Sequence, residues 1–137
     1  AIASIHTSFN LTSRENTRRI ISAISHPKVK ILGHPTNREI GGREPILADW
    51  EEIFGYCANN KKVLEINAYP TRLDLPDDMI RIAIGKGVKL TINTDSHKVK
   101  HMQNMKHGVW QARRGYTKKS DLINTLSLKN LLTVLKL

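Results

Sequence analysis

Four short apolar segments of this chain each end in a polar residue of a kind used in metal or substrate chemistry. The segments are predicted strands, and they lead into His6, His34, Asn67 and, for the fourth, Asp95 with His97. Successive ends are 28, 33 and 28 residues apart, about the length of one strand and one helix. Repeated units of this kind build a parallel sheet or barrel, whose functional residues lie at the carboxyl ends of the strands. The spacing therefore predicts an α/β fold that gathers these residues into one pocket.

Helices are predicted from capping residues and from the period of the apolar residues. Thr12 and Glu15 have capping-box spacing at the start of the first helix, and Pro27 ends it. The third helix begins near Pro76, and after His97 the pattern changes from strand–helix alternation to helices alone. The expected apolar faces are Thr17, Ile20, Ile21 and Ile24; Ile46, Trp50, Ile53, Phe54 and Cys57; Met102, Met105, Val109 and Ala112; Leu122, Ile123 and Leu126 after a Ser120 cap; and Leu128, Leu131, Leu132 and Leu135 after a Ser127 cap.

The length of 137 residues fits one domain, and no linker or low-complexity tract divides it. Four strand–helix units are about half of a barrel and leave two unpaired strand edges. Because the chain begins at Ala1 rather than Met, we expect residues 1–137 to be a fragment whose missing strands lie upstream. Otherwise the chain forms a homodimer or a small open sheet. No signal peptide or membrane-length apolar run is visible, and the single cysteine, Cys57, fits a cytoplasmic protein without an internal disulfide.

Positive charge is concentrated in the last third of the chain. The whole sequence has 22 Lys and Arg against 12 Asp and Glu, a formal net charge of +10. No acidic residue occurs between Ser96 and Ser120. A basic stretch beside a metal pocket favours a polyanionic substrate such as DNA. The alternative is an ordinary solvated basic face.

Asp95 and His97 are the strongest local indication of a metal site. Residues two apart in extended backbone face the same side, about 6.6 Å apart at Cα, and carboxylate and imidazole suit zinc, manganese or iron. The alternative is a surface hydrogen-bonding pair. His6 and His34 end their strands in the same way, which favours a shared site. His26, His101 and His107 lack this placement and are interpreted as non-ligands.

Other polar residues near the strand ends each have two possible roles. Asn67 shares a strand face with Glu65, and a hydrogen-bonded structural role is favoured over catalysis. Arg38, Arg43 and Arg72 follow strand ends and could clamp phosphate oxygens, or instead pair with loop carboxylates such as Glu44 or Asp74. No Ser–His–Asp or Cys–His arrangement is indicated, so metal-assisted hydrolysis fits better.

Six segments of the chain resemble, in order, the carboxyl-terminal part of the polymerase-and-histidinol-phosphatase (PHP) domain. Among PHP domains, this chain most resembles the variant that is attached to bacterial and archaeal X-family DNA polymerases. The segments are residues 3–9 (Ala-Ser-Ile-His-Thr-Ser-Phe), 31–36 (Ile-Leu-Gly-His-Pro-Thr), 65–68 (Glu-Ile-Asn-Ala), 72–75 (Arg-Leu-Asp-Leu), 92–97 (Ile-Asn-Thr-Asp-Ser-His) and 112–115 (Ala-Arg-Arg-Gly). The 72–75 and 112–115 segments point to the polymerase branch. The loop at residues 37–42 departs from the common pattern, which leaves its substrate contacts open.

The resemblance implies a distorted seven-stranded (β/α) barrel with a trinuclear site for zinc, manganese or iron. Of nine ligands in the family, four match here: His6, His34, Asp95 and His97, the last two also as catalytic residues. The other five belong to an upstream half that this sequence does not contain. The implied activity is manganese-dependent phosphodiester hydrolysis, including 3′–5′ exonuclease action and trimming of DNA repair ends.

Three functions follow as hypotheses. The first is a metal-dependent phosphoesterase part of an X-family DNA polymerase, which partners the upstream half-domain, the polymerase domain and DNA. Its candidate substrate-binding residues are Arg38, Asn67, Arg72, Arg113 and Arg114. The second is a phosphatase for a small phosphomonoester of the histidinol-phosphatase type. The third is a non-catalytic DNA-binding piece, because five metal ligands are missing.

Overall fold

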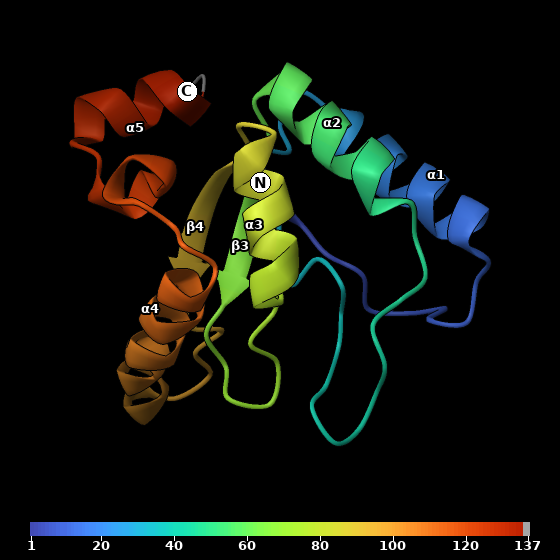
Figure 1. Cartoon of the computed structure of the whole chain (residues 1–137), viewed down its shortest axis with the longest axis horizontal. Coiled ribbons are helices and arrows are strands. Elements are labelled where there is room, and N and C mark those ends of the chain that lie inside the picture. Colours follow the sequence, from blue (N-terminus) through green and yellow to red (C-terminus); the bar gives the residue numbers. More distant parts are fainter. Residues whose placement is uncertain (136–137) are drawn as a thin grey trace.

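A four-stranded parallel sheet forms the centre of the computed structural model, which describes residues 1–135 (Figure 1). The strands are β1 (Ile2–Ala3), β2 (Ile31–Leu32), β3 (Val63–Asn67) and β4 (Lys89–Asn93), and they lie side by side in this order. The α/β class and the parallel strand direction are therefore confirmed. The barrel that the resemblance implies stays a prediction.

The strand register places all four carboxyl ends at the same edge of the sheet. Ala3 pairs with Leu32, and Leu32 pairs with Leu64. The longer pair, β3 and β4, runs in register to its end, where Asn67 lies beside Asn93. Residues that follow these strands consequently leave the sheet on one side, as the spacing predicted.

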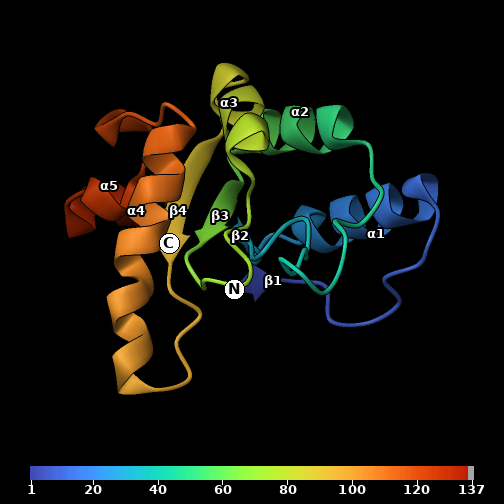
Figure 2. The same cartoon turned by 60° about the horizontal axis from the view of Figure 1, so that its bottom comes forward.

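Three helices alternate with the strands: α1 (Ser13–Ser25), α2 (Trp50–Asn60) and α3 (Asp77–Gly85). The predicted capping box opens α1, because the Thr12 side chain accepts a hydrogen bond from the Glu15 backbone amide and the Glu15 carboxylate accepts one from that of Thr12. The α1 and α2 helices pack against each other on one side of the molecule (Figure 2). The predicted starts of α1 after Thr12 and of α3 near Pro76 are thus confirmed.

The chain after β4 is helical, as expected. It forms η1 (Val99–Asn104), α4 (Met105–Arg114), η2 (Lys119–Asp121), η3 (Ile123–Thr125) and α5 (Leu128–Leu135), where η denotes a 3-10 helix. The α4 helix packs on β3, β4 and α3, and Figure 2 shows it on the side of the sheet away from α1. The α5 helix is the last element described.

The predicted apolar face of α4 is wrong except at Ala112. Met105 and Val109 are exposed, whereas Gly108, Gln111 and Ala112 are buried. Gly108 explains the difference, because a Cβ there would lie only 2.7 Å from the Ala68 Cβ and closer still to Ile92. The helix therefore turns its smallest residue toward the sheet, and its larger apolar side chains face outward.

Two other helix predictions need correction. Ser120 does not cap a single helix, since the segment forms the separate turns η2 and η3. The Asp121 carboxylate accepts a hydrogen bond from the Lys118 backbone amide at the start of η2. Ile46 is buried but precedes α2 instead of lying on its face. Its backbone amide bonds to the Thr36 carbonyl oxygen, which holds the loop that leads into the helix.

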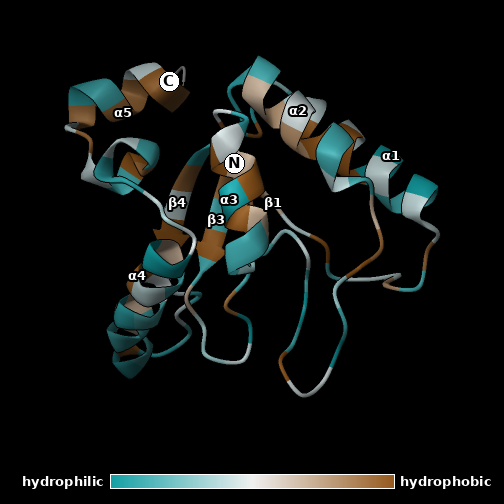
Figure 3. Ribbon diagram, in the orientation of Figure 1, coloured by the Kyte–Doolittle hydropathy of each residue, from teal (hydrophilic) through white to brown (hydrophobic). Residues whose placement is uncertain are grey.

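The apolar core lies between the sheet and the helices that cover it. Hydropathy colouring shows apolar residues on the inward faces and along β3 and β4 (Figure 3). Cys57 on α2 is fully buried there, as predicted, and burial raises the pKa of its thiol to about 12. No helix within residues 1–135 has the length and apolar character needed to cross a membrane.

Candidate functional site

His6 and His34 lie together at the carboxyl ends of β1 and β2. Their ring centroids are 5.1 Å apart and the rings meet edge to face. His6 is exposed, but only 7% of His34 is exposed, and its Nδ1 has no hydrogen-bond partner among residues 1–135. Burial, and secondarily the charge of Arg72, lower the pKa of His34 below its ordinary value. The neutral imidazole is the form that binds a metal ion.

The backbone before His34 passes close to the first strand. A Cβ at Gly33 would lie 3.0 Å from the Ile2 side chain, so glycine permits this approach. His34 itself has a positive φ of 29°. Its backbone amide donates a 2.6 Å hydrogen bond to Glu65 Oε2. The backbone at His34 is therefore fixed by a carboxylate from the neighbouring strand.

Glu65 connects the ends of β2, β3 and β4. It is only 6% exposed. Its Oε1 accepts from the Asn93 side chain at 2.7 Å, and its Oε2 accepts from Asn67 Nδ2 at 3.2 Å and from the backbone amide of His34. Sequence reasoning required a partner for a buried Glu65 but did not assign it to the site. The structure places this carboxylate at its centre.

Asp95 lies next to this group through Asn67. Asn67 Nδ2 also donates to Asp95 Oδ2 at 3.2 Å, in agreement with the hydrogen-bonding role favoured for this residue. Asp95 has a positive φ of 51° and is 32% exposed at its side chain. The same Oδ2 lies 3.6 Å from Arg72 Nε. The carboxylate is thus held between an amide and a guanidinium group at the open end of the sheet.

His97 is turned toward its own loop. Its Nδ1 lies 2.9 Å from the Asp95 carbonyl oxygen, and its backbone amide donates to His101 Nδ1. Within residues 1–135, no group of three or more His, Cys, Asp or Glu side chains is arranged to hold a metal ion. The rings of His6 and His34 are in contact, whereas the His97 ring lies against the backbone carbonyl group of Asp95. The unpaired Nδ1 of His34 and the neighbouring candidate residues are suitable ligands for a metal ion. They would complete a coordination shell only together with further ligands.

Arg38 and Arg72 are both brought to this end of the sheet, but each already has protein partners. Arg72 donates to Asn37 Oδ1 at 2.9 Å and lies 3.6 Å from Glu39. Arg38 donates to the carbonyl oxygens of Arg72 and Leu73. The loop carboxylates that pair with the arginines here are Glu39 and Asp95. Sequence reasoning had named Glu44 and Asp74 instead.

Arg113 and Arg114 lie in the last turn of α4 and are exposed. Arg114 approaches Asp77 at the start of α3, with 3.5 Å between Nη2 and Oδ2. It also lines a pocket with Arg38, so these two predicted phosphate contacts share a surface. No described contact connects Arg113 with the His6–His34 pair.

Sequence reasoning gave Asp74 no site role, yet this residue fixes the loop after β2. It is fully buried, and its carboxylate accepts hydrogen bonds from the Thr36 amide, the Thr36 hydroxyl and the Asn37 amide. Burial raises its pKa to about 6, against the opposing effect of these donors. Asn37 then donates to the Ile5 carbonyl oxygen just before His6. No local pattern could have predicted these contacts between loops.

The chain is similar in sequence to one known DNA polymerase. The chain matches no protein-family model. It is 38% identical over 135 residues to a Bacillus subtilis (strain 168) protein named DNA polymerase/3′-5′ exonuclease PolX. The match covers 98% of this chain and 24% of that protein, so the chain spans about a quarter of the relative's length. This similarity supports the relation to X-family DNA polymerases that the sequence motifs indicated.

Proposed function

We propose that this chain is the carboxyl-terminal portion of a PHP domain in an X-family DNA polymerase. There it contributes to metal-dependent phosphodiester hydrolysis at DNA 3′ ends. The observation that carries the proposal is the 38% identity, over 98% of the chain, to a protein named as a DNA polymerase and 3′-5′ exonuclease. The gathering of polar residues at the carboxyl ends of β1 to β4 supports it, since parallel α/β folds hold their active sites there.

In this proposal His6, His34, Asp95 and His97 are metal ligands, completed by ligands from the preceding half of the domain. The bound ions, Mn²⁺ or Zn²⁺ or Fe²⁺ and up to three of them, would polarise the phosphoryl group and lower the pKa of a bound water. This chain's own contribution is to hold the His34 imidazole neutral and in place. Burial lowers the pKa of the imidazole, and the hydrogen bond from the His34 amide to Glu65 fixes the backbone that carries the ring.

The arginines are proposed to bind the DNA backbone. Arg38 and Arg114 line one pocket, and Arg72 lies beside Asp95. A guanidinium group can hold two phosphate oxygens at once. The lack of acidic residues from Ser96 to Ser120 adds a basic surface on the same part of the chain. A DNA strand fits this charge better than a small phosphomonoester does.

The test is hydrolysis by the longer protein that carries this sequence, with Asp95→Asn as the variant. Asparagine has nearly the same shape and tolerates a positive φ, so the change removes the charge while the fold is kept. Asp78→Asn, at an exposed position on α3, is the matched control. We expect Asp95→Asn to abolish manganese-dependent cleavage of 3′-labelled DNA and Asp78→Asn to leave it unchanged.

Full activity of Asp95→Asn would reject the assignment of this residue. Histidinol phosphate is assayed beside the DNA. Faster turnover of that small ester would favour the phosphatase alternative.

A second candidate function applies to the chain by itself. Residues 1–135 contain no group of three or more metal-binding side chains in position, which favours a DNA-binding piece without activity of its own. Elemental mass spectrometry of the chain purified with manganese and zinc separates the two. A tightly held ion would justify activity assays on this chain. Metal-free protein whose DNA affinity falls with salt would favour the binding piece.

A further inference from the structure

A pocket of about 400 Å³ lies between α4, the start of α3 and the loop after β3. Its volume falls within the range of small-ligand sites. Neither His6 nor His34 lines it, and one wall is formed by Leu73 and by Arg38, which donates to the Arg72 carbonyl oxygen. The side chains that line it include Arg38, Asp77, His107, Trp110, Gln111 and Arg114.

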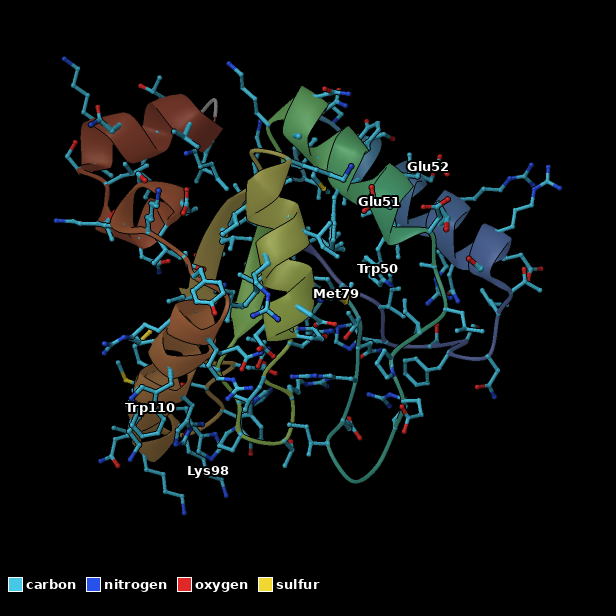
Figure 4. The ribbon with its side chains drawn as sticks, in the orientation of Figure 1. Trp50, Glu51, Glu52, Met79, Lys98 and Trp110 are labelled. Atoms are coloured by element: carbon cyan, nitrogen blue, oxygen red, sulfur yellow. The ribbon has the colours of Figure 1, made fainter. Side chains whose placement is uncertain are left out.

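Trp110 offers this pocket an unusual amount of exposed aromatic surface. It lies on α4, and 56% of it is exposed. Figure 4 shows it together with Lys98 at the end of the molecule toward which the strands point. The core does not need this indole, since α4 packs on the sheet through Gly108 and Ala112. An exposed tryptophan beside arginines is a typical platform for an unpaired nucleic-acid base.

The polar groups around Trp110 suit a nucleotide. Arg114 is exposed and has only a 3.5 Å contact with Asp77. Arg38 uses Nε and Nη2 for backbone carbonyl oxygens, and its Nη1 has no partner among the described residues. His107, whose ring lies 5.4 Å from that of Trp110, has a buried Nδ1 that is also unpaired within residues 1–135. Cations for phosphate thus lie in the same pocket as an exposed aromatic ring.

The geometry points to a subsite for one unpaired nucleotide of single-stranded DNA, with its base stacked on Trp110 and its phosphate held by Arg114 and Arg38. This inference rests on DNA as the substrate class of the proposed function. It adds that a base, and not only a phosphate, contributes to holding the strand. Asp77 limits the positive charge of the pocket, so stacking contributes more to binding there than charge does.

The experiment uses the whole chain in the background Trp50→Phe, which leaves Trp110 as the single tryptophan. Trp50 lies on α2, away from the pocket, beside Phe54. Oligothymidylate of about ten nucleotides, a length within the site sizes of single-strand binders, is titrated in EDTA. The signal is quenching of Trp110 fluorescence. EDTA removes divalent metal ions, so the result does not depend on hydrolysis.

The comparison set contains Trp110→Ala, Trp110→Phe, Arg114→Ala and Arg18→Ala, with affinities measured by anisotropy of a labelled strand. Arg18 is an exposed arginine on α1 and serves as the charge control. An abasic strand of equal length keeps the phosphates and removes the bases. We expect Trp110→Ala to weaken oligothymidylate binding about tenfold, and Trp110→Phe and Arg18→Ala to change it less than about twofold.

The abasic strand should bind Trp110→Ala and the parent chain equally. Arg114→Ala should reduce the salt dependence by about one phosphate. Equal binding of oligothymidylate by Trp110→Ala and the parent would overturn the subsite, as would an equal loss with the abasic strand. Absence of any binding in EDTA would overturn it as well. The Asp95→Asn hydrolysis test still decides the proposed function separately.

Discussion

The carboxyl edge of the sheet and the region of α5 are built in opposite ways. At the carboxyl edge, Glu65 and Asp74 are buried carboxylates, and each accepts hydrogen bonds from two or more partners. None of the described residues of α5 is buried, and two pockets, both lined by Val134, lie beneath the helix. We therefore expect the loops of the candidate site to contribute more to the stability of this chain than its last helix does.

Asp74→Ala should have the largest effect on stability. It leaves the Thr36 amide, the Thr36 hydroxyl and the Asn37 amide without their acceptor in a buried place. We expect the free energy of unfolding to fall by about 3 kcal/mol in urea denaturation. Asp78→Ala, at an exposed position, should change it by less than about 0.5 kcal/mol. Equal effects of the two variants would remove the contrast between the site loops and the surface.

Gly108→Ala should have the second-largest effect on stability. The added methyl group would overlap Ala68 and Ile92, so we expect the free energy of unfolding to fall by about 2 kcal/mol. The matched variant is Gly55→Ala in α2, where the new Cβ would have no atom of the described chain within 4 Å apart from the adjoining residues and the backbone of its own helix. That change should stabilise by about 0.5–1 kcal/mol, because alanine restricts the unfolded chain. Thermal unfolding of both variants measures whether the melting temperature falls for Gly108→Ala and rises for Gly55→Ala. Stabilisation by Gly108→Ala would contradict the packing of α4.

Removal of α5, by ending the chain at Leu126, should have a smaller effect. The described part of the helix buries no residue completely, so we expect a loss of about 1 kcal/mol or less. Urea denaturation of the shortened chain is the measurement, with circular dichroism to confirm that the remaining helices persist. A loss as large as that of Asp74→Ala would show that the two regions do not differ as described.

The smallest expected effect is that of removing α5 on the reactivity of the Cys57 thiol. Its pKa is raised to about 12 by burial, so almost no thiolate is present at pH 8, and the thiolate is the reactive form. We expect iodoacetamide to leave the folded chain unmodified and to react after unfolding in urea. Shortening the chain at Leu126 should not expose the thiol, although Cys57 lines one pocket below α5. Rapid alkylation of the shortened chain would mean that α5 protects the core.

Features of the fold that depend on local sequence could be predicted. The apolar runs predicted the strands before His6 and His34 and the end of β3 at Asn67, although β1 and β2 end earlier, at Ala3 and Leu32. The start of α1 follows from the Thr12–Glu15 capping box. The carboxyl ends of parallel strands then had to meet at one edge. Whether His6, His34, Asp95 and His97 bind metal stays a prediction, since the proposed shell needs ligands from outside this chain.

Features that depend on contacts between distant loops could not be predicted. The outward face of α4 follows from the close approach of Gly108 to Ala68 and Ile92, which no helical period shows. The pairing of Arg72 with Asp95 and the bonds from Thr36 to Asp74 join segments separated by more than twenty residues. In each case the side chain has several candidate partners in the sequence, and only the fold selects one.

The glycine at position 108 also determines how much room a bound nucleotide has. Trp110 and Arg114 are carried by α4, whereas Arg38 is fixed to the loop after β3. The width of the pocket between them is therefore set by how deeply α4 sits on the sheet, which depends on the missing side chain at Gly108. Residue 108 touches no ligand in this arrangement, yet a larger residue there would change which ligands fit, so selectivity can be altered from beneath the helix without changing any contact residue.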